Sequence, residues 1–307
     1  MDSCRRQTGS GYMRRFSFRL TLVTLLAGGA GAILRHFELG SAFEASGLAK
    51  PWAPMTVLLA LFSLAYVVFL FLASRRLGSA VPPEGYAAAF AFRSGLKLAL
   101  HILVSLLLFA AAILCLMGAR SYGPFGEPIF QAEIGALGLL AAISGLCTLL
   151  LSLSAYRQED RGGLPFFSLA PVLFYCLLLI VLYKNRAADP VIRDYVYELF
   201  SVCATLLALF FAAGSACGRP RPKRTVFFGQ LGLFFSLVTL ADGHELWMTA
   251  ICVFSCLWLL LNTYSYGKNL QKSRPAAPAE PELQAEPAPP AEATLPEDPE
   301  IGRDEDE

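Results

Sequence analysis

The sequence predicts an all-α polytopic membrane helix bundle, and three observations lead to this fold class. Of the 307 residues, 55% are hydrophobic and 16% are charged, whereas a typical soluble domain has about 25% charged residues. Eleven of the 24 acidic residues lie in the last 28 positions, so the rest of the chain is poorer still in charge. That remainder consists mostly of apolar runs of about 20 residues, the length at which a helix crosses a bilayer.

Eight such runs are present, and each is expected to form a transmembrane helix. They cover residues 16–34, 52–73, 97–118, 133–154, 165–183, 195–216, 225–241 and 246–266. The first run follows an arginine-rich start and contains Ala30-x-Ala32, so a cleaved signal peptide is the alternative there. We expect it to remain as a span, because it exceeds the roughly 7–15 apolar residues of a signal peptide and further spans follow.

Basic residues alternate between the two sets of loops. Eighteen of the 25 Lys and Arg residues lie in the N-terminal segment, after the second, fourth and sixth runs, and in the C-terminal segment. Six lie in the four opposite loops, so the positive-inside rule predicts that both termini are cytoplasmic. The expected parts are a cytoplasmic segment 1–15, an eight-helix domain 16–266 and a cytoplasmic tail 267–307. The acidic, Pro/Ala/Glu-rich tail is expected to be disordered, because it has too little apolar surface to bury.

The sixth run carries its polar and small residues on one helix face. Asp189 and Pro190 are typical of a helix start. Small or polar residues then recur every three or four positions, namely Asp194, Glu198, Ser201, Thr205, Ala208, Ala212 and Ser215. This spacing places them on one side of a helix, and we expect that side to face the interior of the bundle.

Glu198 is the carboxylate of that face with the deepest expected position. It lies about 13 Å along the helix axis from Asp189, near the outer hydrocarbon boundary, where a carboxylate has to be paired, protonated or in contact with water. One interpretation is an interfacial ion pair, for which the candidate partners are Arg193, Lys184, Arg186 and Arg120. The other is a cation or proton site at the outer mouth of a cavity, with Asp194, Glu198, Ser201 and Thr205 as candidate ligands.

A second candidate site is basic. Arg93, Lys97 and His101 are spaced four residues apart, so on a helix they share one face at the cytoplasmic side. Long basic side chains there extend to the interface and bind acidic lipid headgroups, which is one interpretation. The other is an anion or proton site that opens to the cytoplasm, with His101 as its deepest residue.

The chain lacks the motifs of nucleotide binding, serine hydrolysis and zinc proteolysis. We therefore predict no catalytic residue, no cofactor and no nucleic-acid partner. The eight cysteines form no Cys-x-x-Cys pair and imply no disulfide framework. A divalent cation among His36, Glu38, Asp242, His244 and Glu245 is conceivable, but no spacing requires it, and no metal site is predicted.

Two segments carry a resemblance. Asp189-Pro-Val-Ile-Arg-Asp-Tyr-Val-Tyr-Glu-Leu199 and Leu240-Ala-Asp-Gly243 resemble segments of uncharacterised multi-spanning membrane proteins of Gram-positive, clostridia-like bacteria. The resemblance implies a bacterial plasma membrane and no particular activity. We expect an accessory or interaction component in contact with the lipid bilayer and with a protein partner in the membrane. The alternatives are a small-solute or ion transporter that uses the polar face of the sixth span, and a membrane-embedded enzyme acting on lipids.

Overall fold

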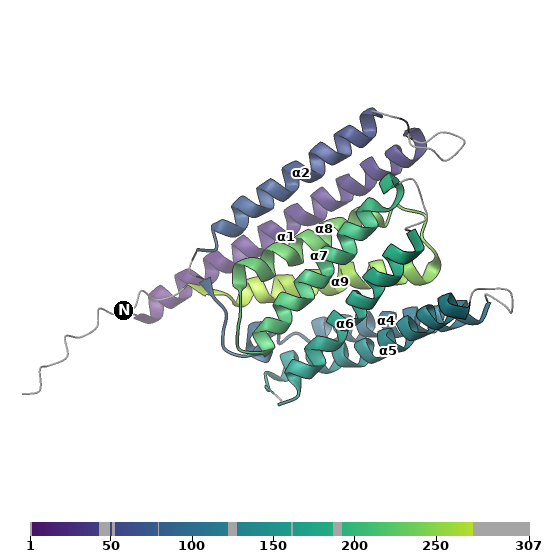
Figure 1. Cartoon of the computed structure of the whole chain (residues 1–307). Helices are drawn as coiled ribbons and strands as arrows, with labels where there is room; N and C mark the ends of the chain where they lie inside the picture. Colours follow the sequence, from purple (N-terminus) through teal and green to yellow (C-terminus); the bar gives the residue numbers. More distant parts are fainter. Residues whose placement is uncertain are drawn as a thin grey trace, which may run out of the picture. The chain divides into compact units, whose positions relative to one another are not determined.

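The computed structural model describes residues 2–42, 50, 53–78, 80–121, 128–160, 162–186 and 192–272, and within them the chain is predominantly helical. Figure 1 shows the long helices packed side by side. The elements are α1 (Asp2–Ser41), α2 (Pro54–Arg75), β1 (Ala80–Val81), α3 (Tyr86–Ala89), α4 (Gly95–Ser121), α5 (Pro128–Arg157), α6 (Leu164–Arg186), α7 (Ile192–Ala216), α8 (Pro222–Thr239), α9 (Leu246–Asn269) and β2 (Gln271–Lys272).

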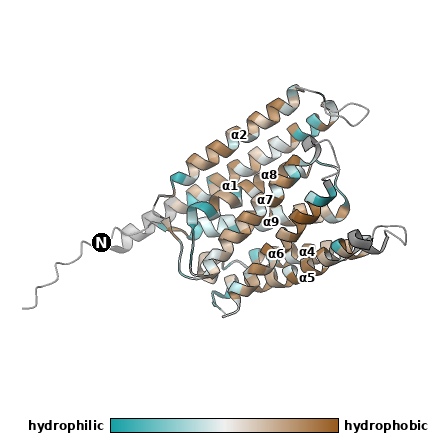
Figure 2. Cartoon of the chain, in the orientation of Figure 1, coloured by the Kyte–Doolittle hydropathy of each residue, from teal (hydrophilic) through white to brown (hydrophobic). Residues whose placement is uncertain are grey.

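Seven of the described helices are long and apolar enough to cross a membrane, so the chain has the build of a multi-pass membrane protein. The spans are Met13–Ser41, Pro54–Arg75, Gly95–Gly118, Ala132–Arg157, Leu164–Asn185, Tyr195–Ala216 and Leu246–Asn269. They correspond to seven of the eight expected runs. In Figure 2 hydrophobic residues extend along these helices and hydrophilic ones gather toward the ends.

The remaining expected span corresponds to α8, which has 18 residues and a length of about 27 Å at 1.5 Å per residue. Lys223, Arg224 and Gln230 make it less apolar than α2, α4, α5, α6, α7 and α9. Helix α8 packs against α1, α2, α7 and α9. Among the described side chains, α8 exposes no large apolar group and α9 exposes Leu246 alone. Because α8 is surrounded by protein, it does not need a lipid-facing apolar surface, and the count of eight spans stays a prediction.

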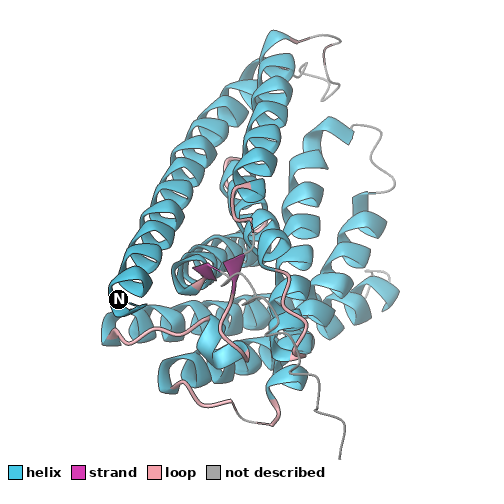
Figure 3. Ribbon diagram, turned by 90° about the vertical axis from the view of Figure 1, so that its left-hand side faces the viewer, coloured by secondary structure: helices cyan, strands magenta, loops and turns pink. Residues whose placement is uncertain are grey.

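The described parts of α1 and α9 bring Ser17 and Gly267 together at one end of the bundle. The Ser17 hydroxyl donates to the carbonyl of Tyr264 at 3.4 Å, and a Cβ on Gly267 would lie 2.5 Å from Ser17 Oγ. At this Gly267 end, β1 pairs with β2 in antiparallel register, which Figure 3 shows as two short strands. Arg35 and Asp242 meet at the opposite end, which we call the Arg35 end. The chain between Ser17 and Gly267 therefore crosses the bundle an even number of times, and which end is cytoplasmic stays a prediction.

The helices at the two ends of the domain extend beyond the expected runs. Helix α1 begins at Asp2, so helix precedes the candidate span that starts at Met13. Residues 267–272 belong to the folded domain, because α9 continues to Asn269 and β2 follows. The Asn269 amide donates to the carbonyls of Ala89 and Ala91 at 3.1 and 2.9 Å, and this contact holds the end of α9. The rest of the expected tail, 273–307, lies outside the described residues.

Close packing of α1 against α8 positions the candidate site. A Cβ on Gly28 would lie 2.5 Å from Leu237 of α8, and one on Gly31 would lie 2.7 Å from Val238. Glycine at these two positions lets the helix backbones approach, as small residues do in membrane bundles. The Gln230 amide also donates to the hydroxyl of Thr21 at 3.0 Å. These contacts fix the register that brings the last turns of α1 beside the turn between α8 and α9.

Candidate functional site

The polar face of α7 points into the bundle, as the spacing predicts. Glu198, Ser201 and Thr205 are each no more than 2% exposed. On the other faces of the helix, Phe200 and Phe210 are 49% and 54% exposed. The predicted inward orientation is confirmed, and Glu198 is an interior residue. The fourth predicted ligand, Asp194, lies in the first turn of α7, and its side chain is outside the described part of the structure.

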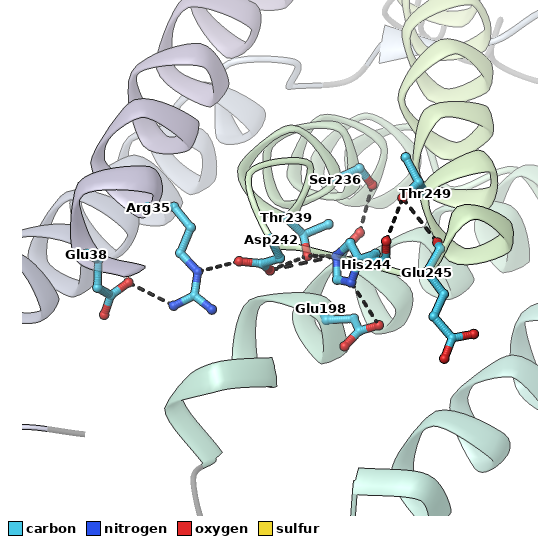
Figure 4. Close-up of polar contacts among 10 residues, drawn as sticks. Arg35, Glu38, Glu198, Ser236, Thr239, Asp242, His244, Glu245 and Thr249 are labelled. Atoms are coloured by element: carbon cyan, nitrogen blue, oxygen red, sulfur yellow. Dashed lines mark hydrogen bonds and ion pairs between the residues drawn. The ribbon is translucent and has the colours of Figure 1, made fainter. Parts of the chain in front are cut away.

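Polar side chains from α1, α7, the end of α8 and the α8–α9 turn converge at the Arg35 end of the bundle (Figure 4). All are buried. We call this group the Arg35 cluster; its members are Arg35, Glu38, Glu198, Thr239, Asp242 and His244. The cluster contains three carboxylates, one guanidinium and one imidazole, so its charges have to be compensated from within the protein.

Arg35 holds two of the carboxylates. Its Nη1 lies 2.9 Å from Glu38 Oε2, and its Nε lies 2.6 Å from Asp242 Oδ1. Figure 4 shows the guanidinium between the two acidic side chains. The guanidinium carbon also lies 5.2 Å from the ring centre of Tyr197 on α7, a cation–π contact. Arg35 thus connects α1 to α7 and to the α8–α9 turn.

His244 approaches the other carboxylate. Its Nδ1 lies 3.6 Å from Glu198 Oε1, and its Nε2 lies 3.8 Å from Asp242 Oδ2. The sequence proposed basic residues as partners of Glu198, and His244 was not among them. One of those candidates, Lys184, instead forms an ion pair with Glu133. The side chains of the other three candidates, Arg120, Arg186 and Arg193, lie outside the described residues.

The hydrogen bonds of Thr239 determine where the protons of His244 lie. The Thr239 hydroxyl is 2.8 Å from Asp242 Oδ2 and 3.1 Å from His244 Nε2. Asp242 is ionised beside Arg35 and can only accept, so the single hydroxyl proton of Thr239 points to it. His244 Nε2 must then carry a hydrogen and donate it to the Thr239 oxygen.

The Nδ1 side of the His244 ring shows where a second proton can bind. If His244 is neutral with its hydrogen on Nε2, Nδ1 is a bare lone pair that faces Glu198 at 3.6 Å. An ionised carboxylate and a lone pair repel each other in a buried site. A proton removes this repulsion, whether it sits on Nδ1 as part of an imidazolium or on the Glu198 carboxyl. The contact can therefore hold one proton between Glu198 and His244.

Hydroxyl groups continue from Glu198 along the interface of α7 with α8. Ser201 Oγ and Ser236 Oγ are 2.8 Å apart. One turn further, the buried Thr205 Oγ1 has no hydrogen-bond partner within the described structure. One turn further along α7, Ala208 and Ala212 line a cavity of about 30 Å³ together with Asn262 and Thr263 of α9. At about 10–15 Å³ per water molecule, it has room for about two.

The basic candidate site is partly rearranged. Arg93 lies in the exposed loop before α4 and does not share its face, because the helix begins at Gly95. Lys97 lies in the first turns of α4, with Nζ 4.7 Å from the ring centre of Tyr264. His101 is 1% exposed and lies deepest, as expected from the sequence. The three residues therefore do not form one basic face.

The acidic and histidine residues near the Arg35 end do not assemble as metal ligands. Arg35 lies between Glu38 and Asp242, and His36 is exposed on α1. Figure 4 shows Glu245 directed away from His244, and its carboxylate accepts a hydrogen bond from Trp247 at 2.6 Å. In the described part of the chain, no group of three or more His, Cys, Asp or Glu side chains could hold a metal ion.

The sequence did not identify Arg35 as the centre of this cluster. Neither of the two candidate sites predicted from the sequence includes Arg35, although a basic residue at the end of an apolar run, three residues before Glu38, is a pattern that can indicate a buried pair. Comparison of the chain with protein-family models, with curated proteins and with solved structures finds no match. The fold itself defines the class, a multi-pass integral membrane protein.

Proposed function

We propose that this chain is an eight-span protein of a bacterial plasma membrane, with both termini in the cytoplasm, that moves protons across the membrane. The Arg35 end then faces outward, and the shared proton of Glu198 and His244 is the transported one. This proposal develops the transporter alternative for the sixth span and specifies its ion. The eighth span is α8, whose length of about 27 Å is close to the hydrocarbon thickness of about 30 Å.

The observation that carries the proposal is the contact between Glu198 Oε1 and His244 Nδ1. The hydrogen bond from Thr239 to Asp242 leaves the facing atoms of this contact as two acceptors unless a proton is present. Carboxylates and imidazoles are the groups that relay protons in membrane proteins. Arg35 neutralises neighbouring carboxylates without exchanging protons itself, because a guanidinium stays charged.

A route away from the pair runs along the polar face of α7. Ser201 and Ser236 can each donate and accept, and Thr205 lies one turn beyond. A water molecule near Thr205 would satisfy its buried hydroxyl and extend the chain of hydrogen bonds toward the cavity. The route uses Glu198, Ser201 and Thr205, which are three of the ligands that the sequence proposes.

The test is proton uptake by the purified full-length chain in proteoliposomes that contain a pH-sensitive dye, with an imposed pH gradient and a potassium diffusion potential. We expect uptake by the wild-type chain, and a loss of roughly tenfold or more in Glu198→Gln and in His244→Gln. Glu133→Gln is the matched control, because it removes a carboxylate from a partly exposed ion pair outside the cluster. Gel filtration and the melting temperature report whether each variant is folded.

Two results would overturn the proposal. One is wild-type vesicles that take up no more protons than empty vesicles under either gradient. A second membrane protein that co-purifies in mild detergent would then favour the accessory-component hypothesis. The other is uptake at the wild-type rate by a folded Glu198→Gln variant.

A further inference from the structure

His101 on α4 is a buried titratable residue that the Arg35 cluster does not use. It is 1% exposed and lies among aromatic side chains. The ring of Phe92 stacks on it, with centres 4.7 Å apart and planes 11° apart, and Trp258 of α9 meets it edge to face at 5.6 Å. Its Nδ1 lies 3.3 Å from Ser152 Oγ on α5.

The proton of the neutral His101 ring can be placed by the same argument as in the cluster. The Ser152 hydroxyl is 2.8 Å from the carbonyl oxygen of Thr148, which can only accept, so the hydroxyl hydrogen points there. The Ser152 oxygen must accept from His101, and Nδ1 therefore carries the hydrogen. Nε2 is left as a lone pair, and it is buried without a hydrogen-bond partner in the described part of the chain.

His101 lies near a positively charged residue, whereas His244 of the Arg35 cluster lies near carboxylates. Lys97 lies one turn earlier on the same helix as His101, and its ammonium group contacts the ring of Tyr264 on α9. The uncharged groups that face His101 come from α5, from α9 and from the segment before α4, namely Ser152, Trp258 and Phe92. No carboxylate is in contact with it among the described residues. His244, in contrast, lies 3.6 Å from a carboxylate oxygen of Glu198 and 3.8 Å from one of Asp242.

We propose that His101 is a proton-binding site on the release side of the pathway, an inference that rests on the proposed proton transport. A proton adds to the Nε2 lone pair while Ser152 holds Nδ1, and the neighbouring positive charge of Lys97 favours its departure. Trp258 contacts His101 and also lines the cavity next to Asn262, so the site adjoins the route from Thr205. The carboxylate-rich Arg35 end would bind the proton, and the lysine-bearing Gly267 end would release it.

The test is nitrogen NMR of the full-length chain with ¹⁵N-labelled histidine, in detergent and over a range of pH. The three histidines can be assigned by His36→Gln, His101→Gln and His244→Gln. We expect the neutral His101 ring to carry its hydrogen on Nδ1, and we expect Lys97→Met to move the appearance of its protonated form to higher pH. Exposed His36, on α1, is the control whose titration should not move.

The proposal is overturned if the neutral ring carries its hydrogen on Nε2, or if Lys97→Met leaves the His101 titration unchanged. Ser152→Ala gives a second check that keeps the ring: it removes the acceptor of Nδ1–H and should increase the share of the Nε2–H form. Proton uptake by Lys97→Met, expected to be several-fold slower than wild type, tests the link to transport. These NMR results do not depend on flux, so failure of the proposed function and failure of this inference can be told apart.

Discussion

Asp242→Asn should destabilise the fold more than any single change at an exposed ion pair. Asp242 accepts from Arg35 Nε at 2.6 Å and from Thr239 at 2.8 Å, and its side chain is 8% exposed. Breaking a buried ion pair by removing one partner costs about 3–5 kcal/mol. Asparagine keeps one oxygen that can accept, and Glu38 still holds the other side of Arg35, so we expect a loss of about 3 kcal/mol.

The assay is thermal unfolding in detergent, followed by intrinsic tryptophan fluorescence. At about 2–4 °C for each kcal/mol, the melting temperature should fall by about 6–12 °C. Glu133→Gln is the matched control: it breaks an ion pair in which Lys184 is 54% exposed, and such pairs contribute about 0–1 kcal/mol. Equal melting temperatures for the two variants would refute the argument that the buried Arg35 pair holds the helices together.

Three further changes test other contacts of the bundle. Gly28→Ala should lower the free energy of unfolding by about 1–3 kcal/mol, because its Cβ would lie 2.5 Å from Leu237. Gly29→Ala, whose Cβ would have no atom within 4 Å, should be neutral or stabilising by up to about 1 kcal/mol. Thermal unfolding of the two variants compares these effects. Tyr66→Phe loses a buried hydrogen bond of 2.8 Å to α1 and should cost about 1 kcal/mol in the same measurement. Burial raises the pKa of Tyr86 in the folded chain. Above about pH 10 the unfolded chain therefore loses this proton first, and the stability of the fold decreases as pH rises. Tyr86→Phe should make this decrease smaller in melting curves taken at pH values from about 9 to 11.

The sequence alone was sufficient to predict the long apolar helices. Seven expected runs coincide with the seven apolar helices, because a bilayer imposes length and hydrophobicity on any such helix. It was also sufficient for the orientation of α7, since residues at helical spacing share a face wherever the helix lies. Helix ends were less predictable: α9 continues to Asn269 because the loop near Ala89 supplies acceptors, and nothing local in the sequence indicates them.

The cluster could not have been assembled from the sequence. Arg35 and Asp242 are 207 positions apart, and their contact depends on the packing of α1 against α8. Pairing of Glu198 with His244 depends on the turn after α8, where His244 N–H bonds to the Asp242 carbonyl at 2.9 Å and so sets the direction of the ring. Counting charges along the sequence did not point to His244 as a neighbour of Glu198, because it considers lysine and arginine and not which residues the fold brings close.

The large sequence separation between Arg35 and its partner Asp242 has a consequence for biosynthesis. Helix α1 is made early, but Asp242, its partner for Arg35, is made 207 residues later. At about 5–20 residues per second, α1 waits roughly 10–40 s for that carboxylate. Glu38, three residues from Arg35, is available as soon as the helix forms, so it can neutralise the arginine in the meantime. A nascent chain with Glu38 replaced would lack this carboxylate during those seconds, and we expect quality-control proteases to degrade more of it before Asp242 is made.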